Sequence, residues 1–138
     1  MECAVVMTWK HRVRWAECDM HGHMNHAAYL VLFEDMRVAH WESLGQSFKP
    51  NSVGPVVGRL AVRYIKALGY GDEITLHLRV PSLRRTSFTH EYVVEKDGER
   101  VFECEAVLVC VDNGLGASIP IPPEARALMI ERDGATAA

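Results

Sequence analysis

The segment from 26 to 44 most restricts how this chain of 138 residues can fold. Drawn as a helix, it leaves only a narrow polar stripe between its apolar side chains: Tyr29, Leu30, Val31, Leu32, Phe33, Met36, Val38, Ala39, Trp41 and Leu44. A helix that is apolar on most sides has to be covered by other parts of the protein. Asn25 suits the N-cap position, and Gly45 suits the position just after the helix. We therefore predict one long helix buried inside the fold.

The rest of the chain is dominated by patterns typical of β-strands. A strand with one wet face is predicted over 8–15, where Trp9, His11, Val13 and Trp15 alternate with Lys10, Arg12 and Arg14. After a loop at 46–55, four strand-like runs follow, near 56–66, 73–83, 86–96 and 100–111. The Asp97-Gly98 dipeptide between the last two runs predicts a tight hairpin.

Four residues, Pro120-Ile-Pro-Pro123, end the last strand-like run. A short helix is predicted over 124–132, with Pro123 at its first position, and 133–138 are expected to be a disordered tail. Residues 1–132 would then form a single domain. The predicted fold class is α+β: an antiparallel five-stranded curved sheet wrapped around one long central helix, so that each buries the apolar face of the other.

Composition excludes several classes of function. The formal charge of −3 gives no bulk attraction to nucleic acid, and no apolar run approaches the roughly 20 residues that span a bilayer. The four cysteines, Cys3, Cys18, Cys104 and Cys110, form no CxxC pair. We expect no signal peptide and a reducing, cytoplasmic location.

A loop of unusual composition precedes the long helix: Asp19-Met-His-Gly-His-Met-Asn-His26. Backbone N–H groups at a helix N-terminus are unpaired and favour negative charge. A carboxylate facing such a corner suits attack on a carbonyl group, so Asp19 is our candidate catalytic residue. Alternatively, Asp19 stabilises the loop by accepting hydrogen bonds from nearby backbone N–H groups, as Asp commonly does.

The histidines of this loop raise the question of a metal site. Imidazole groups bind zinc well, but the spacing of His21, His23 and His26 does not make them converge on one ion. We therefore predict no metal site. Instead, we expect His23 and Asn25 to hold the loop by hydrogen bonds and to orient Asp19.

Two residues of the predicted helix offer alternatives. Glu34 is either a second candidate catalytic carboxylate or, as we favour, the ion-pair partner of Arg37 at i+3. Tyr29 is expected to pack in the core with its hydroxyl near the substrate pocket. Cys18 has no designated partner base and is expected to be a small packing residue.

The loop and helix start resemble the signature of the hotdog-fold acyl-CoA thioesterases, specifically the 4-hydroxybenzoyl-CoA thioesterase-like group. The resemblance rests on Cys18–His26, Tyr29, Glu34 and Arg37, and continues through Val62-Arg63-Tyr64, Leu68, Gly71-Asp72, Arg85-Thr86-Ser87-Phe88, Val109–Asp112 and Pro120–Pro122. It covers about residues 8–126. His26 departs from the family pattern, which has a second Asn at this position.

The resemblance implies a single hotdog domain that pairs into a homodimer with a continuous sheet, often doubled to a homotetramer. Asp19 would be the catalytic carboxylate, acting as nucleophile or as general base, and the backbone N–H of His26 would point at the thioester carbonyl. Coenzyme A would enter as part of the substrate, and no separate cofactor is expected. Arg84 and Arg85 would hold its phosphates, with Thr86 and Ser87 adding hydroxyl contacts. Alternatively, the two arginines are ordinary solvated residues of a turn.

The predicted function is hydrolysis of an acyl or aroyl thioester to free acid and thiol, with catalytic residues Asp19, His23, Asn25 and His26. The carrier is coenzyme A or an acyl-carrier protein, and the acyl group is not specified by the sequence. Two alternatives remain: a dehydratase of the same fold, which needs a His base, and a non-catalytic acyl-CoA binding module.

Overall fold

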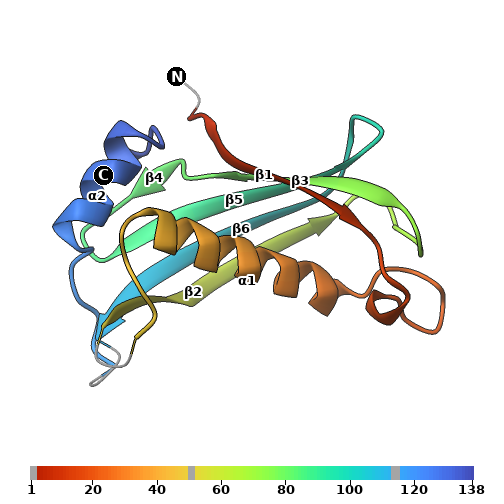
Figure 1. The fold of residues 1–138 in the computed structure, drawn as a ribbon, viewed down its shortest axis with the longest axis horizontal. Helices are drawn as coiled ribbons and strands as arrows, with labels where there is room; N and C mark the ends of the chain where they lie inside the picture. The colour runs from red at the N-terminus through yellow and green to blue at the C-terminus, as the bar shows by residue number, and fades with distance from the viewer. Residues whose placement is uncertain (1–2, 50–51, 113–115) are drawn as a thin grey trace.

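The computed structural model describes residues 3–49, 52–112 and 116–138. One face of a curved sheet carries a long helix, and a second helix lies at one end (Figure 1). The elements are β1 (Val5–Arg12), a 3-10 turn (Trp15–Glu17), α1 (His26–Ser43), β2 (Val53–Tyr64), β3 (Glu73–Arg79), β4 (Ser82–Leu83), β5 (Ser87–Lys96), β6 (Glu99–Asp112), α2 (Pro123–Glu131) and β7 (Thr136–Ala137).

The sheet is larger than predicted. Its long strands lie in the order β1-β3-β5-β6-β2, and each neighbouring pair is antiparallel. Two short strands, β4 and β7, extend the sheet to seven strands. Because β4 and β7 pair in parallel, the sheet is mixed. The prediction of a five-stranded, purely antiparallel sheet was therefore wrong in both respects. The α+β class stands, and the short second helix predicted over 124–132 is present as α2, which begins at Pro123.

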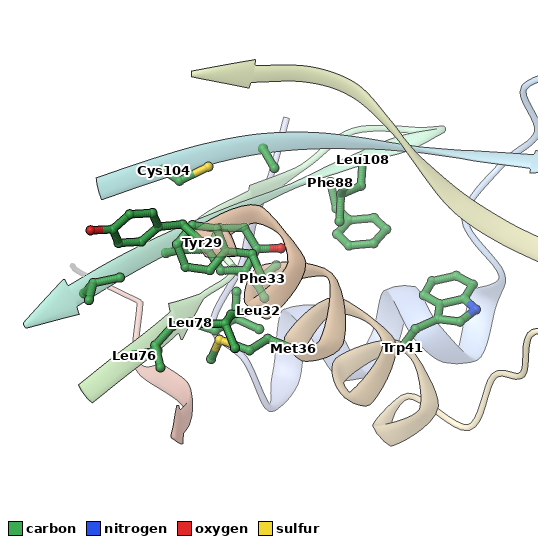
Figure 2. Packing of buried hydrophobic residues seen from close by; sticks show 14 of the residues in the cluster. Tyr29, Leu32, Phe33, Met36, Trp41, Leu76, Leu78, Phe88, Cys104 and Leu108 are labelled. Carbon is green, nitrogen blue, oxygen red and sulfur yellow. The ribbon is translucent and has the colours of Figure 1, made fainter. Parts of the chain in front are cut away.

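Helix α1 packs on the sheet through stacked aromatic rings (Figure 2). Tyr29 stacks on Phe102 with ring centroids 4.1 Å apart, and Phe33 stacks on Tyr92 at 4.4 Å. Such pairs contribute about 0.5–1.5 kcal/mol beyond the burial of their area. The opposite side of the helix is open, since Val31 is 57% exposed. In a single chain, α1 is thus covered on one face only, and the prediction of burial on most sides was wrong.

Residue type explains the backbone at one turn and at one irregular position inside a strand. Asp97 and Gly98, between β5 and β6, both have positive φ, at 53° and 79°. This confirms the predicted hairpin, whose turn needs residues that tolerate that region. At Gly58, β2 has an irregular register against β6. A Cβ there would lie 2.9 Å from a methyl carbon of Val109, so only glycine allows this close approach.

Both ends of the described chain differ from expectation. The first strand ends at Arg12, and Trp15 lies in the 3-10 turn with 73% of its surface exposed, instead of on the dry face of a strand. The last residues, expected to be disordered, have defined positions. Asp133 and Ala135 are buried, and Thr136–Ala137 pair with β4. Contacts with residues distant in sequence hold this segment in place.

Two further expectations concern loops and membranes. Pro50 and Asn51, in the predicted loop at 46–55, lie outside the described residues, and β2 begins within that range, at Val53. Among the residues that are described, no helix is long and apolar enough to cross a membrane.

Candidate active site

The loop that carries Asp19 is closed by its own backbone. Asp19 N–H donates to the carbonyl of His23 at 2.9 Å, and Gly22 N–H donates to the carbonyl of Asp19 at 3.0 Å. Gly22 has φ 76°, a conformation that favours glycine. Asp19 Oδ1 accepts from the backbone N–H of His21 at 2.9 Å and of His23 at 3.3 Å. The side chain thus has the loop-stabilising contacts of the simpler hypothesis.

The electrostatics of Asp19 keep it ionised. The hydrogen bond from the His21 N–H, helped by that from His23, lowers the pKa of Asp19 below its ordinary value. Its second oxygen, Oδ2, accepts no hydrogen bond within the described part of the chain, and the residue is exposed. A fixed, charged carboxylate with one free oxygen is equipped to attack a carbonyl carbon or to take a proton from water.

Glu17 anchors the start of this loop, and the sequence analysis missed it. Its carboxylate, only 6% exposed, accepts hydrogen bonds from Arg14 N–H and His11 Nε2, both at 2.7 Å. Burial raises the pKa of Glu17, but these hydrogen bonds outweigh it and lower the pKa overall. In the sequence, Glu17 follows a strand with one solvent-exposed face, where a carboxylate is an ordinary surface residue. No signal in the sequence pairs Glu17 with His11.

The far side of the loop is fastened to the segment before β3. Met24 N–H donates to the carbonyl of Leu68 at 2.7 Å, and His23 forms an isolated bridge with Gly69. Asp72 in turn accepts from Gly69 N–H at 2.8 Å and pairs with Lys96 at 3.1 Å. The hydrogen bond from Gly69 lowers the pKa of Asp72, so this second carboxylate is also ionised.

The helix start lies directly after this loop. Asn25 is the N-cap, as predicted, and its side chain accepts from Ala27 N–H at 2.8 Å. The side chain of Asn25 therefore does not orient Asp19, and His23 holds Asp19 through its backbone only. Within the described chain, His26 N–H has no acceptor, so this donor is available to a ligand.

Two residues on α1 clarify the alternatives for the site. Glu34 lies 3.7 Å from Arg37 and is largely exposed, which agrees with the favoured ion-pair hypothesis. Tyr29 is 2% exposed. Burial raises the pKa of Tyr29 to about 12, so its phenol is neutral. A hollow of about 400 Å³ lies beside the helix start and is lined by Glu17, Cys18, Asn25, Ala28 and Val31, among others.

The arginine turn forms a separate feature. Arg84 and Arg85 are exposed, and Arg84 N–H donates to the carbonyl of Ser87 at 2.7 Å. Thr86 is half-buried. Arg84 and Ser87 line a groove of about 490 Å³ on the sheet, together with Arg59 and Thr89. The groove offers two guanidinium groups and hydroxyl groups, which suit a phosphorylated ligand, but the carboxylate of Glu105 lines it too. Arg85 and Thr86 are not among the described residues that line it.

The two features lie at opposite ends of the folded molecule: the loop before α1 is at one end, and the connection from β4 to β5 is at the other (Figure 1). Tyr29, near the start of α1, contacts Phe102, and Phe102 pairs with Val94 on β5, whereas Ser87 begins that strand. At about 3.3 Å per residue, β5 alone separates Val94 from Ser87 by roughly 23 Å. The structure thus places Asp19, His23, Asn25 and His26 on one loop and the helix start that follows it, with backbone hydrogen bonds joining Asp19 to His23, but it does not bring Arg84 or Arg85 to them.

No cluster of three or more His, Cys, Asp or Glu side chains suitable for a metal ion occurs in the ranges that the structure describes. Cys18 donates a weak hydrogen bond to the carbonyl of Arg14, with Sγ 3.7 Å from the oxygen. Burial raises the pKa of Cys104 to about 11 and that of Cys110 to about 12, so both are inert core thiols.

Comparison with known proteins identifies the group to which this arrangement belongs. Residues 13–129 match the family described as the thioesterase-like superfamily. The chain belongs to this thioesterase-like superfamily. The prediction made from the loop signature is thus confirmed. The superfamily assignment fits the observed sheet, with its long helix on one face.

Individual members of the thioesterase-like superfamily agree with this assignment. The acyl-CoA thioester hydrolase YbgC of Escherichia coli O6:H1 is 27% identical over 108 residues, covering 75% of this chain and 81% of that protein. The crystal structure of a thioesterase superfamily protein from Jannaschia sp. CCS1 has 32% identity and a TM-score of 0.86, covering 97% of this chain and 87% of that one. A thioesterase from Thermus thermophilus, solved with coenzyme A and Zn, has 27% identity and a TM-score of 0.75, with coverages of 90% and 97%.

Proposed function

We propose that this protein hydrolyses acyl-CoA thioesters to free acid and coenzyme A. One observation carries the proposal: an ionised carboxylate with a free oxygen, Asp19, stands on a hydrogen-bonded loop that leads into the start of α1, where the N–H of His26 has no acceptor within the described chain. The superfamily assignment and the acyl-CoA thioester hydrolase among the relatives support the same reaction. The reducing cytoplasm suits a chain with four free cysteines.

The chemistry divides between two groups. The thioester carbonyl oxygen accepts a hydrogen bond from His26 N–H, where the partial positive charge of the helix N-terminus opposes the developing oxyanion. Such a donor contributes roughly 3 kcal/mol in comparable sites. Asp19 either attacks the carbonyl carbon to give a mixed anhydride or removes a proton from the attacking water. In both routes the carbon–sulfur bond breaks, and the thiolate leaves and takes up a proton. In the first route water then cleaves the anhydride, which releases the free acid and restores the Asp19 carboxylate.

A panel of acyl-CoAs with a thiol-trapping dye tests this proposal. The panel contains short, long and aromatic acyl groups, one enoyl-CoA, and one acyl-carrier-protein thioester. We expect thiol release from at least one member at a rate well above that of the buffer. A protein that binds these compounds but releases no thiol is a binding module, and one that hydrates an enoyl-CoA with its thioester intact is a dehydratase.

The arginine turn provides a second prediction. If Arg84 and Arg85 hold the phosphates of coenzyme A, changing both to Ala removes contacts that are equal in the ground and transition states. KM for acyl-CoA should then rise about tenfold, with little change in kcat, since charge-assisted contacts on an open surface are worth only part of their full 1.5–3 kcal/mol. The effect should shrink at high salt.

A short thioester without the nucleotide is the control for this double variant. It should be hydrolysed equally by wild type and variant. Equal KM values for full acyl-CoA would instead show that the two arginines are only solvated turn residues.

The separation of the arginine turn from Asp19 supports a dimer. Strand β2 is at an edge of the sheet, and its side chains Val56, Val57, Leu60, Val62 and Tyr64 are 40–55% exposed. An open apolar edge strand favours pairing with another copy. A two-fold axis perpendicular to β2 would pair the two β2 strands antiparallel and cover this surface, and the partner's arginine turn could then reach the end of the sheet that carries Asp19. We propose such a homodimer, and a homotetramer is the next assembly to test.

Light scattering at micromolar concentration tests the dimer. We expect twice the mass of the chain, or four times if dimers pair. Leu60→Glu should give a monomer that has lost activity, because a charge on the edge strand opposes pairing, whereas Lys66→Ala, which changes an exposed residue beyond β2, should remain a dimer. A monomeric wild type with full activity would contradict the proposal.

A further inference from the structure

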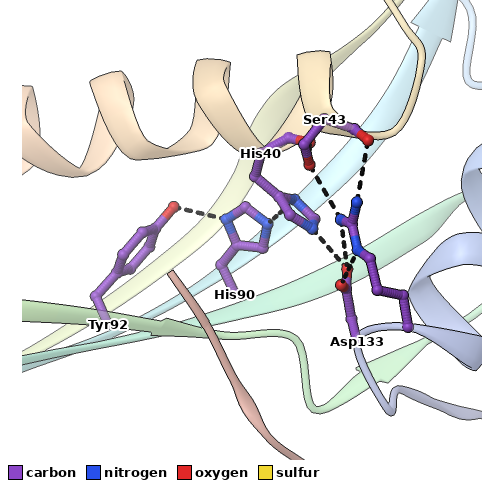
Figure 3. A network of polar contacts seen from close by, with 6 residues as sticks. His40, Ser43, His90, Tyr92 and Asp133 are labelled. Carbon is purple, nitrogen blue, oxygen red and sulfur yellow. Dashed lines mark hydrogen bonds and ion pairs between the residues drawn. The ribbon is translucent and has the colours of Figure 1, made fainter. Parts of the chain in front are cut away.

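A chain of buried polar groups lies under the C-terminal half of α1, away from the Asp19 loop (Figure 3). The Tyr92 hydroxyl lies 2.8 Å from His90 Nδ1, His90 Nε2 lies 3.0 Å from His40 Nδ1, and His40 Nε2 lies 2.8 Å from Asp133 Oδ2. All four residues are 0–1% exposed. Because no substrate can reach them, these groups act by holding segments of the protein together.

The direction of the hydrogen bond between His40 and Asp133 follows from the charge of the Asp133 carboxylate. Burial raises the pKa of Asp133, but bonds from His40 and Arg132 lower it overall, so the ionised carboxylate can only accept. His40 Nε2 therefore donates to Asp133 Oδ2. The remaining protons can be placed so that His90 Nε2 donates to His40 Nδ1 and the Tyr92 O–H donates to His90 Nδ1. Every ring nitrogen is used once, which makes the network rigid.

The network fixes the position of Asp133, and with it the segment that contains α2 and β7. Arg132 adds bonds to the end of α1: its Nη1 donates to the carbonyl of Ser43 and its Nη2 contacts Ser43 Oγ, both at 3.0 Å. The segment of residues 121–138, which we call the clasp, is thus fastened to α1 by side chains separated by about 90 positions in sequence.

The clasp in turn holds the backbone before and within the arginine turn. Thr136 N–H donates to the carbonyl of Pro81 at 3.0 Å, and Ala138 N–H donates to that of Leu83 at 2.9 Å. The next two carbonyls are also occupied. Arg84 O accepts from Arg126 Nη1 at 2.8 Å, and Arg85 O accepts from Ile121 N–H at 3.0 Å.

The side chains of Arg84 and Arg85 are exposed, so the direction in which they leave the protein depends on this backbone. We infer that the clasp positions the arginine turn for coenzyme A, with Asp133 and His40 as positioning residues at its anchor. The inference rests on the proposed function of the turn. A turn that is already held in its binding conformation loses little conformational entropy when the ligand binds. A loosened turn binds more weakly, because its affinity is scaled by the fraction of time that it spends in the binding conformation.

A variant lacking residues 136–138 tests this inference, because it removes the donors to Pro81 and Leu83 and leaves the Asp133 anchor in place. Since Ala138 also lines the groove, Ala138→Gly, which keeps the backbone donor, controls for the loss of its side chain and should bind coenzyme A as wild type does. We expect coenzyme A itself to bind about 3- to 10-fold more weakly by calorimetry. KM for acyl-CoA should rise by the same factor, while kcat, and the hydrolysis of a short thioester without the nucleotide, stay unchanged. Amide exchange at 82–86 should be faster, and coenzyme A should restore its protection.

Thr136→Ala is the matched control, since it keeps the backbone N–H and should behave as wild type. Asp133→Ala should have the same effect as the deletion if it folds, and Asp133→Asn, which retains an acceptor for His40, should recover part of the binding. If the deletion leaves coenzyme A affinity unchanged, or weakens the short thioester equally, the inference is wrong. A wild type that binds coenzyme A but hydrolyses no thioester would contradict only the proposed function.

Discussion

Replacing Asp19 by Asn should leave the fold intact and reduce thioester hydrolysis by about 10²–10⁴-fold or more, the usual contribution of a general base. The amide nitrogen and oxygen nearly match the carboxylate in shape, and the amide oxygen can still accept the loop bonds from His21 and His23. The substitution removes only the negative charge of the side chain and the basicity of Oδ2, the oxygen that accepts no loop hydrogen bond. Initial rates with the best acyl-CoA of the panel, at equal protein concentration, measure the effect.

Glu34→Gln is the matched control, because it makes the same chemical change on an exposed carboxylate of α1. It should retain wild-type turnover. If the Asp19 variant kept more than about a third of wild-type activity while Glu34→Gln was inactive, the helix carboxylate would be the catalytic one.

The second large effect is on stability at acid pH, and it arises from His90. Burial, followed by the nearby His40 and Arg37, lowers the pKa of His90 well below 6.5. Tyr92 and Phe88 also contact its ring. The unfolded chain therefore binds a proton at His90 below pH 6.5 where the folded chain does not, so stability is lost as the pH falls. The free energy of unfolding should therefore fall with decreasing pH below 6.5, by at most about 1.4 kcal/mol for each pH unit from this one group.

Urea unfolding at fixed protein concentration, at several values from pH 7.5 to 4.5, measures this slope. His90→Gln is the comparison, because its amide can donate to His40 and accept from Tyr92 without titrating. The variant should have a clearly shallower pH dependence over this range. Asp133 and Glu17, whose pKa values are lowered, should contribute mainly at lower pH. Parallel curves for wild type and variant would mean that His90 does not control acid stability.

Local sequence signals predicted the parts of the fold that local chemistry determines. Asn25 forms the N-cap, Asp97-Gly98 forms the hairpin, and Pro123 begins α2, because each residue's own backbone or side chain favours that geometry. The irregular strand ends were less predictable. Leu83 belongs to a short strand only because it pairs with Phe88 on β5, and Thr136 only because it pairs with Ser82 on β4.

Sequence reasoning likewise predicted the local part of the site and missed its long-range contacts. Asp19 and His26 are close in sequence, so their loop and helix start followed from a short signature. The anchors that shape the molecule are not local: His40 and Asp133 are 93 positions apart, and no periodicity pairs them. The distance between Asp19 and Arg84 was likewise invisible to sequence reasoning, since neighbouring strands in the sheet can run in either direction.

The most direct test of the account is to count both products of a single reaction. Wild-type protein is incubated with its best acyl-CoA, and thiol and free acid are measured together, beside the Asp19→Asn variant. The account predicts one free acid for each thiol with wild type, and almost none of either with the variant. An acyl-CoA that stays intact with wild type, or equal product from both proteins, would contradict it.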